Sequence, residues 1–192
     1  MPLQAIDLAR ALAEPLARQT HPERPFSGRR AAVLMLLYDR DAHAHLLLTK
    51  RSARLSAHPG QVSLPGGMRE PEDRSLMVTA LRETQEEVGI PPERVRIIGR
   101  LDDVHTVATD FLVRPFIGLA TGPVRPTPAS EEVDRVMEVS VDEILDIDRR
   151  LPEGLAVATT RYPLDGEDVW GATARMLRLF AAIARGALAE RR

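Results

Sequence analysis

The sequence predicts one soluble domain of the mixed α/β (α+β) class. Short apolar runs typical of buried strands are interspersed with segments of helical periodicity, and no internal repeat or low-complexity linker divides the chain. With 192 residues, of which 44% are hydrophobic and 28% charged, the chain is long enough for one sizeable core. A net charge of −2 argues against a nucleic-acid-binding protein. The longest apolar run is also too short to cross a bilayer.

Residues 1–20 are predicted to form an amphipathic helix. Apolar residues recur there at roughly helical spacing. They are Leu3, Ile6, Leu8, Leu12 and Leu16. Asp7 and Glu14 interrupt the apolar stretch, so the segment is not typical of a secretory signal. The chain contains no cysteine and so has no disulfide framework, and we expect a cytoplasmic protein.

The next part of the chain predicts two strands and a long loop. Ala31–Tyr38 is a continuous apolar run that favours a strand buried on both faces, and Ala44–Thr49 is its expected hairpin partner. Lys50–Arg74 is irregular and contains several prolines and glycines. Loops of this length inside a compact domain are usually functional.

A helix is predicted over Ser75–Val88, with Asp73 or Ser75 as its N-cap and Gly89 as its left-handed C-cap. Three further strands are expected, of which the middle one is interrupted at Pro115. They span Val95–Gly99, Phe111–Leu119 and Val133–Val139. Two helices complete the pattern. They span Val141–Ile147 and Val169–Arg185, and the second places Trp170 in the core.

The helix over Ser75–Val88 carries three carboxylates on one face. Glu83, Glu86 and Glu87 are spaced i, i+3 and i+4, so their mutual repulsion favours a bound cation, and oxygen ligands at this density suit Mg²⁺ or Mn²⁺. Gly66-Gly67, earlier in the chain, allows the backbone to approach a ligand closely. Such a pocket can hold divalent ions against a diphosphate and activate a water molecule. The ordinary alternative is a solvated helix face.

Residues 66–90 carry the most specific motif. Gly67 is followed at fixed spacing by Asp73, by Arg82-Glu83-Thr84, by Glu86-Glu87 and by Gly89-Ile90. This pattern resembles the signature of the Nudix hydrolases, which cleave nucleoside diphosphates linked to another moiety. It departs from that signature in having one additional residue before Arg82, Asp73 in place of Glu and Thr84 in place of an apolar residue.

A second motif precedes the signature. The stretches 47–52 and 58–67 are similar to the motif of the coenzyme A diphosphatases, in which the longer spacing and an Asp at position 73 also occur. Ser56 stands where that motif usually has Arg, and Leu64 where it usually has Phe. Weaker similarity extends the resemblance to roughly residues 30–180, and the whole chain 1–192 is interpreted as a single Nudix hydrolase domain.

The resemblance implies a Nudix α/β/α sandwich with a mixed sheet, a catalytic loop-helix-loop and Mg²⁺ or Mn²⁺ as cofactor. The reaction implied is hydrolysis of coenzyme A, and possible hydrolysis of its thioesters, to 3′,5′-adenosine bisphosphate and 4′-phosphopantetheine. Glu83, Glu87 and Glu86 are the expected metal ligands together with the Gly66 carbonyl, and Arg82 orients a carboxylate. Glu86 and Glu132 are both candidates for the general base.

Contacts to the substrate are expected from the loop around the second motif. They involve Lys50, Arg51, Ser52, His58, Gly60, Gln61 and Gly67. Lys50 and Arg51 are expected to neutralise the 3′-phosphate of coenzyme A. Because of Ser56 and Leu64, ADP-ribose, a dinucleotide or a nucleoside triphosphate stays an alternative substrate.

A non-catalytic nucleotide sensor on the same fold is the alternative of another class, and the presence of all three helix carboxylates argues against it. The predicted partner is a small molecule, without nucleic acid or membrane, and a homodimer stays open.

Overall fold

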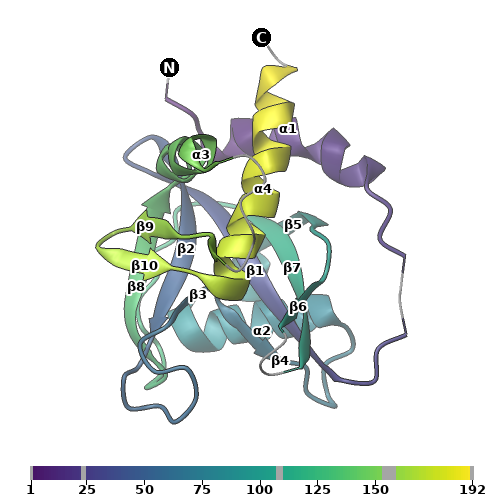
Figure 1. The fold of residues 1–192 in the computed structure, drawn as a ribbon, viewed down its shortest axis with the longest axis vertical. Helices are drawn as coiled ribbons and strands as arrows, with labels where there is room; N and C mark the ends of the chain where they lie inside the picture. The colour runs from purple at the N-terminus through teal and green to yellow at the C-terminus, as the bar shows by residue number, and fades with distance from the viewer. Residues whose placement is uncertain (1, 23–24, 107–109, 153–158, 191–192) are drawn as a thin grey trace.

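The computed structural model describes residues 2–22, 25–106, 110–152 and 159–190. At its centre β1 (Arg29–Arg40) pairs antiparallel with β2 (His43–Arg51) and parallel with β7 (Phe111–Ala120). β8 (Val133–Ser140) continues the sheet beyond β2, and β5 (Val95–Arg100) continues it beyond β7. The result is the mixed sheet that the sequence predicts (Figure 1).

Helices cover both faces of this sheet. α2 (Leu76–Val88) packs on one face. The other face is covered by α1 (Ala5–Arg18), α3 (Val141–Arg150) and α4 (Gly171–Ala189). The described residues include no helix that is long and apolar enough to cross a membrane.

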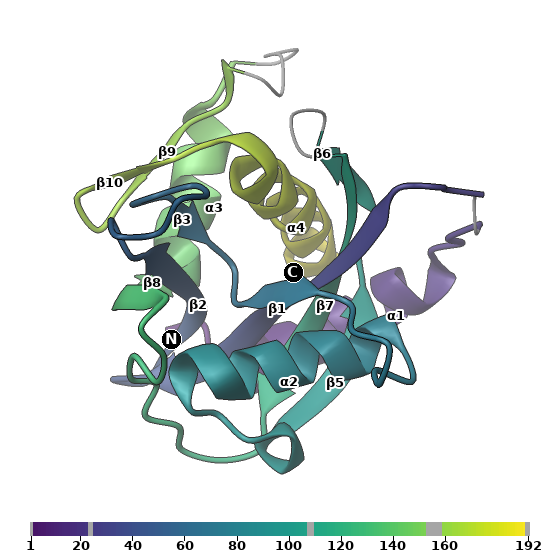
Figure 2. The ribbon, with the colours of Figure 1, turned by 90° about the horizontal axis from the view of Figure 1, so that it is seen from below.

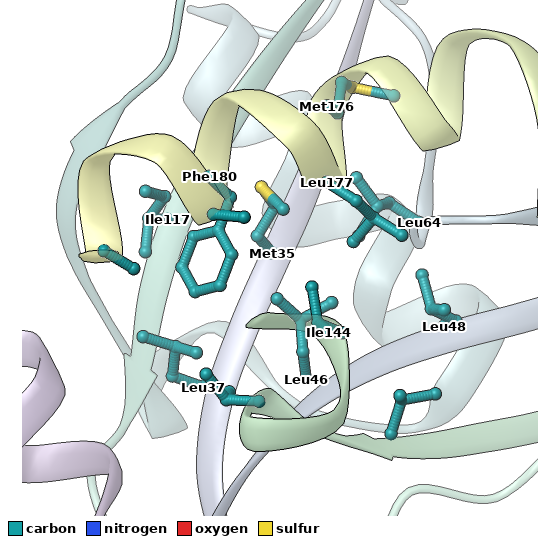
Figure 3. Packing of buried hydrophobic residues seen from close by; sticks show 14 of the residues in the cluster. Met35, Leu37, Leu46, Leu48, Leu64, Ile117, Ile144, Met176, Leu177 and Phe180 are labelled. Carbon is teal, nitrogen blue, oxygen red and sulfur yellow. The ribbon is translucent and has the colours of Figure 1, made fainter. Parts of the chain in front are cut away.

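β1 separates two hydrophobic cores. Its side chains alternate in direction, so that Leu34 and Leu36 join the cluster beneath α2 while Met35 and Leu37 join the larger cluster beneath α4. Figure 3 shows Met35 beside Phe180 and Leu177 of α4 in the larger cluster. Burial on both faces explains why the strand reads as a continuous apolar run, and it produces the predicted α/β/α sandwich.

Several short elements escaped the sequence analysis because they span only two or three residues. They are β3 (Val62–Ser63), β4 (Gly66–Met68), β6 (Val104–Thr106), the single-turn helix η1 (Pro92–Arg94), and the hairpin β9 (Tyr162–Leu164) and β10 (Glu167–Val169). β3 and β4 lie inside the stretch that was interpreted as irregular loop. β4 pairs with the first half of β1 although two of its three residues are glycines.

The predicted interruption at Pro115 is wrong, because β7 runs through that residue. The Pro115 carbonyl accepts a hydrogen bond from the Leu101 N–H, in the segment between β5 and β6. The N–H and C=O of a strand residue point to the same side of the strand. The N–H that Pro115 lacks would therefore also point toward the segment between β5 and β6, so the proline removes no hydrogen bond between paired strands.

The expectation that Trp170 lies in the core is also wrong. The last helix begins at Gly171, immediately after Trp170, and Trp170 is 46% exposed. Val169 occupies the buried position instead, with no exposed surface. The predicted helix therefore begins two residues too early, at the last residue of β10.

Candidate active site

The ends of α2 are fixed by the residues that the sequence suggests. Of the two candidate N-caps it is Ser75 whose side chain accepts a hydrogen bond from the Val78 N–H, at 3.3 Å. Gly89 ends the helix with a left-handed φ of 71°, and its N–H donates to the Gln85 carbonyl. The helix therefore presents its acidic face in a fixed register.

Asp73 has a different role from capping. Its carboxylate is buried and accepts hydrogen bonds from the Thr79 hydroxyl at 2.9 Å and the Glu70 N–H at 3.0 Å. The Arg82 guanidinium donates to both carboxylate oxygens, from Nε at 3.2 Å and Nη2 at 3.1 Å, and holds the pKa of Asp73 down at about 2. Asp73, which precedes α2, thus fixes the position of the Arg82 guanidinium. The spacing of the two residues in the sequence does not reveal this role.

Arg82 distributes its remaining donors over the acidic face. Nη1 contacts Glu86 Oε2 at 2.9 Å, and Nη2 lies 3.0 Å from Glu83 Oε1. Nη2 also donates to the Met68 carbonyl of β4 at 3.3 Å. The guanidinium therefore links two helix carboxylates to the glycine strand.

The two glycines of β4 make room for the carboxylates. A Cβ on Gly67 would lie 2.4 Å from the carboxylate carbon of Glu83, so that side chain occupies the space that glycine leaves. Gly66 has a φ of 151°, and a Cβ there would lie 2.3 Å from the Ala32 carbonyl oxygen. The Gly66 N–H donates to Glu87 Oε2 at 3.4 Å. Both glycines are thus required by close approach.

The electrostatics of this face suit a cation. Burial, reinforced by the neighbouring Glu83, raises the pKa of Glu87 to about 8, and its side chain is only 6% exposed. Burial also raises the pKa of Glu83. Two adjacent carboxylates that are costly to ionise form a hard oxygen donor set, which fits Mg²⁺ or Mn²⁺.

The third carboxylate points elsewhere. Among the described residues no three acidic or histidine side chains converge closely enough to hold a metal ion. Glu86 is 56% exposed and bound to Arg82. A complete coordination sphere therefore needs either Glu86 to rotate away from Arg82 or a further oxygen, for which the Gly66 carbonyl stays the candidate.

Two residues from other strands and loops join the site. Arg51, at the end of β2, lies with Nη2 3.4 Å from Glu132 Oε2. The Ser52 N–H donates to the Glu132 carbonyl at 2.7 Å, which holds the two segments together. Arg51 lowers and Glu132 raises the pKa of Glu87, so both charges act directly on the buried carboxylate. The sequence-predicted Arg51, Glu132 and Glu87 therefore share one electrostatic environment.

Other predicted contact residues lie differently. Lys50 Nζ is 2.7 Å from Glu167 of β10 rather than beside the helix carboxylates. Ser52 is completely buried and accepts hydrogen bonds from the backbone and side chain of Arg54. Ser52 therefore shapes its loop and is not exposed to a ligand.

Backbone hydrogen bonds link Arg51 to the loop that follows it. The Gln61 carbonyl accepts from the Arg51 N–H at 2.9 Å, and the Gln61 N–H donates to the His58 carbonyl at 3.3 Å. His58 is exposed and has a positive φ of 54°, as has Gly60 with 67°. This tight turn positions the backbone on which Arg51 depends.

The two departures from the coenzyme A motif fall in different environments. Leu64 is 1% exposed and packs beside Leu177 of α4 (Figure 3). Its substitution for Phe therefore alters the core and not the wall of a ligand site. Ser56 is exposed in the loop.

The fold and the acidic helix together define a class of metal-dependent phosphohydrolases. The family model of the NUDIX domain matches residues 28–159. The chain is 37% identical over 163 residues to the uncharacterized Nudix hydrolase NudL of Pectobacterium atrosepticum. The aligned region covers 82% of this chain and 84% of that protein. It is 40% identical over 169 residues to the NudL of an Enterobacter species, with 80% and 81% covered.

Solved structures show the same fold. An Ap4A hydrolase binary complex of C. elegans matches with a TM-score of 0.56 and 18% identity over 82% of this chain and 98% of that one. The NUDIX domain of Shewanella oneidensis NrtR complexed with ADP ribose also has a TM-score of 0.56 and 18% identity, over 92% and 97%. The chain belongs to the Nudix family and is a Nudix hydrolase, an enzyme class that generally uses divalent metal ions.

Proposed function

We propose that this Nudix hydrolase cleaves the diphosphate bond of coenzyme A. The observation that carries the proposal is the position of Arg51, in the first stretch of the coenzyme-A-like motif, beside Glu132 and within electrostatic reach of the buried Glu87. A cation there provides a partner for a phosphate group that the hydrolysed diphosphate itself does not include. The products are 3′,5′-adenosine bisphosphate and 4′-phosphopantetheine.

The helix carboxylates and the glycine strand supply the metal site in this proposal. Glu83 and Glu87 would hold the ion, with Glu86 or the Gly66 carbonyl as a further ligand. A bound Mg²⁺ or Mn²⁺ would neutralise the diphosphate and lower the pKa of a water molecule. Arg82, fixed by Asp73, keeps Glu83 in place against the glycine strand.

The hydrolysis requires one proton acceptor. The water oxygen forms a bond to one phosphorus, the bridging oxygen leaves with the other phosphate, and a carboxylate takes the proton from the water. Glu132 and Glu86 are both exposed enough to meet a water molecule, at 58% and 56%. Glu132→Gln and Glu86→Gln, compared over a pH–rate profile, identify the base as the variant that loses the acidic limb, because a general base must be deprotonated to accept the proton.

Arg51 and Lys50 are expected to have unequal roles. The Lys50 ammonium is already paired with Glu167, whereas Arg51 faces the acidic site through Glu132. We therefore assign the 3′-phosphate to Arg51. A cytoplasmic location and a homodimer stay predictions from the sequence.

The test is hydrolysis of coenzyme A by the purified protein with Mg²⁺ or Mn²⁺, with chromatographic separation of the products and ADP-ribose assayed in parallel. Equimolar release of 3′,5′-adenosine bisphosphate and 4′-phosphopantetheine is expected, and EDTA should abolish it. Glu83→Gln should be inactive, while Glu93→Gln, an exposed acid in η1, serves as the matched control.

The other outcomes distinguish the alternatives. Cleavage of ADP-ribose but not of coenzyme A would keep the metal chemistry and refute the assigned substrate. A protein that binds both nucleotides and turns over neither would instead be a sensor on this fold.

A further inference from the structure

Trp170 is the only tryptophan of the chain, and its residue surface is 46% exposed. It follows the buried Val169 at the end of β10, so the alternation of a strand turns its indole outward. Gly171 then adopts a left-handed φ of 65° and leads the chain into α4. Among the described residues the other exposed large hydrophobic side chains are Met and Val, so Trp170 is the aromatic member of that set.

The indole belongs to a small polar and aromatic face. Arg161 lies at the start of the same hairpin with its guanidinium carbon 5.5 Å from the centre of the Trp170 ring. Asp168, two residues before Trp170, holds the Arg161 guanidinium at 3.4 Å. The ring is thus oriented by a cation–π contact while about half of its surface stays open.

This face is connected to β3, the strand that precedes the glycine strand β4. The Thr173 hydroxyl, in the first turn of α4, donates to the Val62 carbonyl of β3 at 3.1 Å. Val62 precedes Gly66 by four residues, which span at most about 14 Å of extended chain. Figure 2 shows β3 beside the hairpin of β9 and β10 that leads into α4. The face around Trp170 is therefore joined, through α4 and β3, to the segment that leads into the glycine strand beside the helix carboxylates.

We propose that Trp170 and Arg161 form a subsite for the purine base of the nucleotide substrate. This inference rests on the proposed function for the presence of a nucleotide and adds the place where its base is held. A flat base stacks on an indole face whatever its identity, and a guanidinium beside the ring suits the electron-rich edge of a base. A single aromatic side chain beside charged groups is too small for a protein-docking patch, which favours a small planar ligand.

The experiment uses the intrinsic fluorescence of the full-length protein, excited where only tryptophan absorbs, so that the signal comes from Trp170 alone. Titration with ADP in the presence of Mg²⁺ is expected to give saturable quenching. Pyrophosphate, which has the same phosphates and no base, is expected to bind without quenching. The readout does not depend on turnover of coenzyme A, so it can fail or succeed separately from the proposed function.

Substitutions test the stacking itself with whichever diphosphate the enzyme hydrolyses. Trp170→Leu should raise KM about 10-fold with kcat nearly unchanged, because one stacked base is lost. Trp170→Phe keeps an aromatic face and should recover most of that affinity, which separates stacking from a folding defect. Arg161→Gln should give a smaller rise in KM.

Two results would overturn the inference. Equal quenching by pyrophosphate and ADP would mean that phosphate binding elsewhere alters the environment of Trp170. Unchanged fluorescence at ADP concentrations well above the KM of the hydrolysed substrate, together with equal KM values for Trp170→Leu and the wild type, would leave the indole outside the substrate site.

Discussion

Replacement of Asp73 by Asn tests whether a buried carboxylate holds the catalytic helix to its loop. Asn retains the shape of the side chain and removes the charge that Nε and Nη2 of the Arg82 guanidinium contact. Arg82 would then keep Glu86 and Glu83 on the helix face and the Met68 carbonyl as its charged and polar partners. We expect the protein to fold, to lose stability and to lose part of its kcat, because Arg82 no longer fixes Glu83.

The magnitude follows from the pKa of Asp73. The folded environment lowers it from 3.8 to about 2, mainly through the hydrogen bonds from Arg82. A shift of one pKa unit corresponds to about 1.4 kcal/mol, so the charged form is favoured by roughly 2.5 kcal/mol. Hydrogen bonds to charged groups contribute about 1.5–3 kcal/mol, which agrees. For a protein of this size the substitution should lower Tm by about 5–10 °C.

The pH dependence provides the sharper assay. Because the folded pKa lies below the unfolded one, Asp73 contributes its full stability above about pH 4 and loses it as the pH falls toward about 2. In urea unfolding at several pH values, the difference between the wild type and Asp73→Asn should be constant from pH 7 to pH 5 and shrink below pH 4. Glu86→Gln, which removes an exposed partner of the same Arg82, should cost less than about 1 kcal/mol. A difference that stays the same at pH 3, or one below about 0.5 kcal/mol at pH 7, would refute the reasoning.

Three further predictions concern the acidic face and the loop beside it. Glu87→Gln should abolish turnover and yet leave the metal-free protein at least as stable as the wild type in thermal melts at pH 8 with EDTA; a large drop in Tm would contradict this. The reason is that the pKa of Glu87 is raised to about 8, so the folded state loses stability as the pH rises toward that value and the carboxyl group is drawn to ionise. Gly67→Ala should lower kcat with little change in Tm, since the new methyl group displaces only the flexible end of the Glu83 side chain. Gly66→Ala should lower Tm strongly, because its Cβ would meet backbone atoms at a positive φ, and equal Tm values for the two variants would contradict this. Arg51→Ala should raise KM for coenzyme A more than for the analogue that lacks the 3′-phosphate, with Lys50→Ala as the matched control, and equal effects on the two substrates would remove Arg51 from that phosphate.

The part of the fold that the sequence predicts is the part with strong periodicity. β1 and α2 were located because burial on two faces, or on one helical face, leaves a pattern over many residues. β3, β4 and the hairpin of β9 and β10 have two or three residues each, too few for a pattern, and they form through tertiary pairing with longer strands or with each other. Trp170 was misplaced for the same reason, since a three-residue strand was absorbed into the helix that follows it.

The same distinction applies to the candidate site. The sequence predicts which residues share one helix face, but not which residues are brought together from different segments. The i, i+3 and i+4 spacing places Glu83, Glu86 and Glu87 on one face, but it cannot show that Arg82 holds Glu86 toward solvent while Glu87 is buried. Asp73, which lies outside the helix, fixes the guanidinium that binds Glu86. The raised pKa of Glu87 has the same kind of origin, because burial under the glycine strand is a property of the packed fold. The motif in the sequence therefore identifies the candidate acids, whereas the packing of the fold buries Glu87 and leaves Glu86 exposed and bound to Arg82.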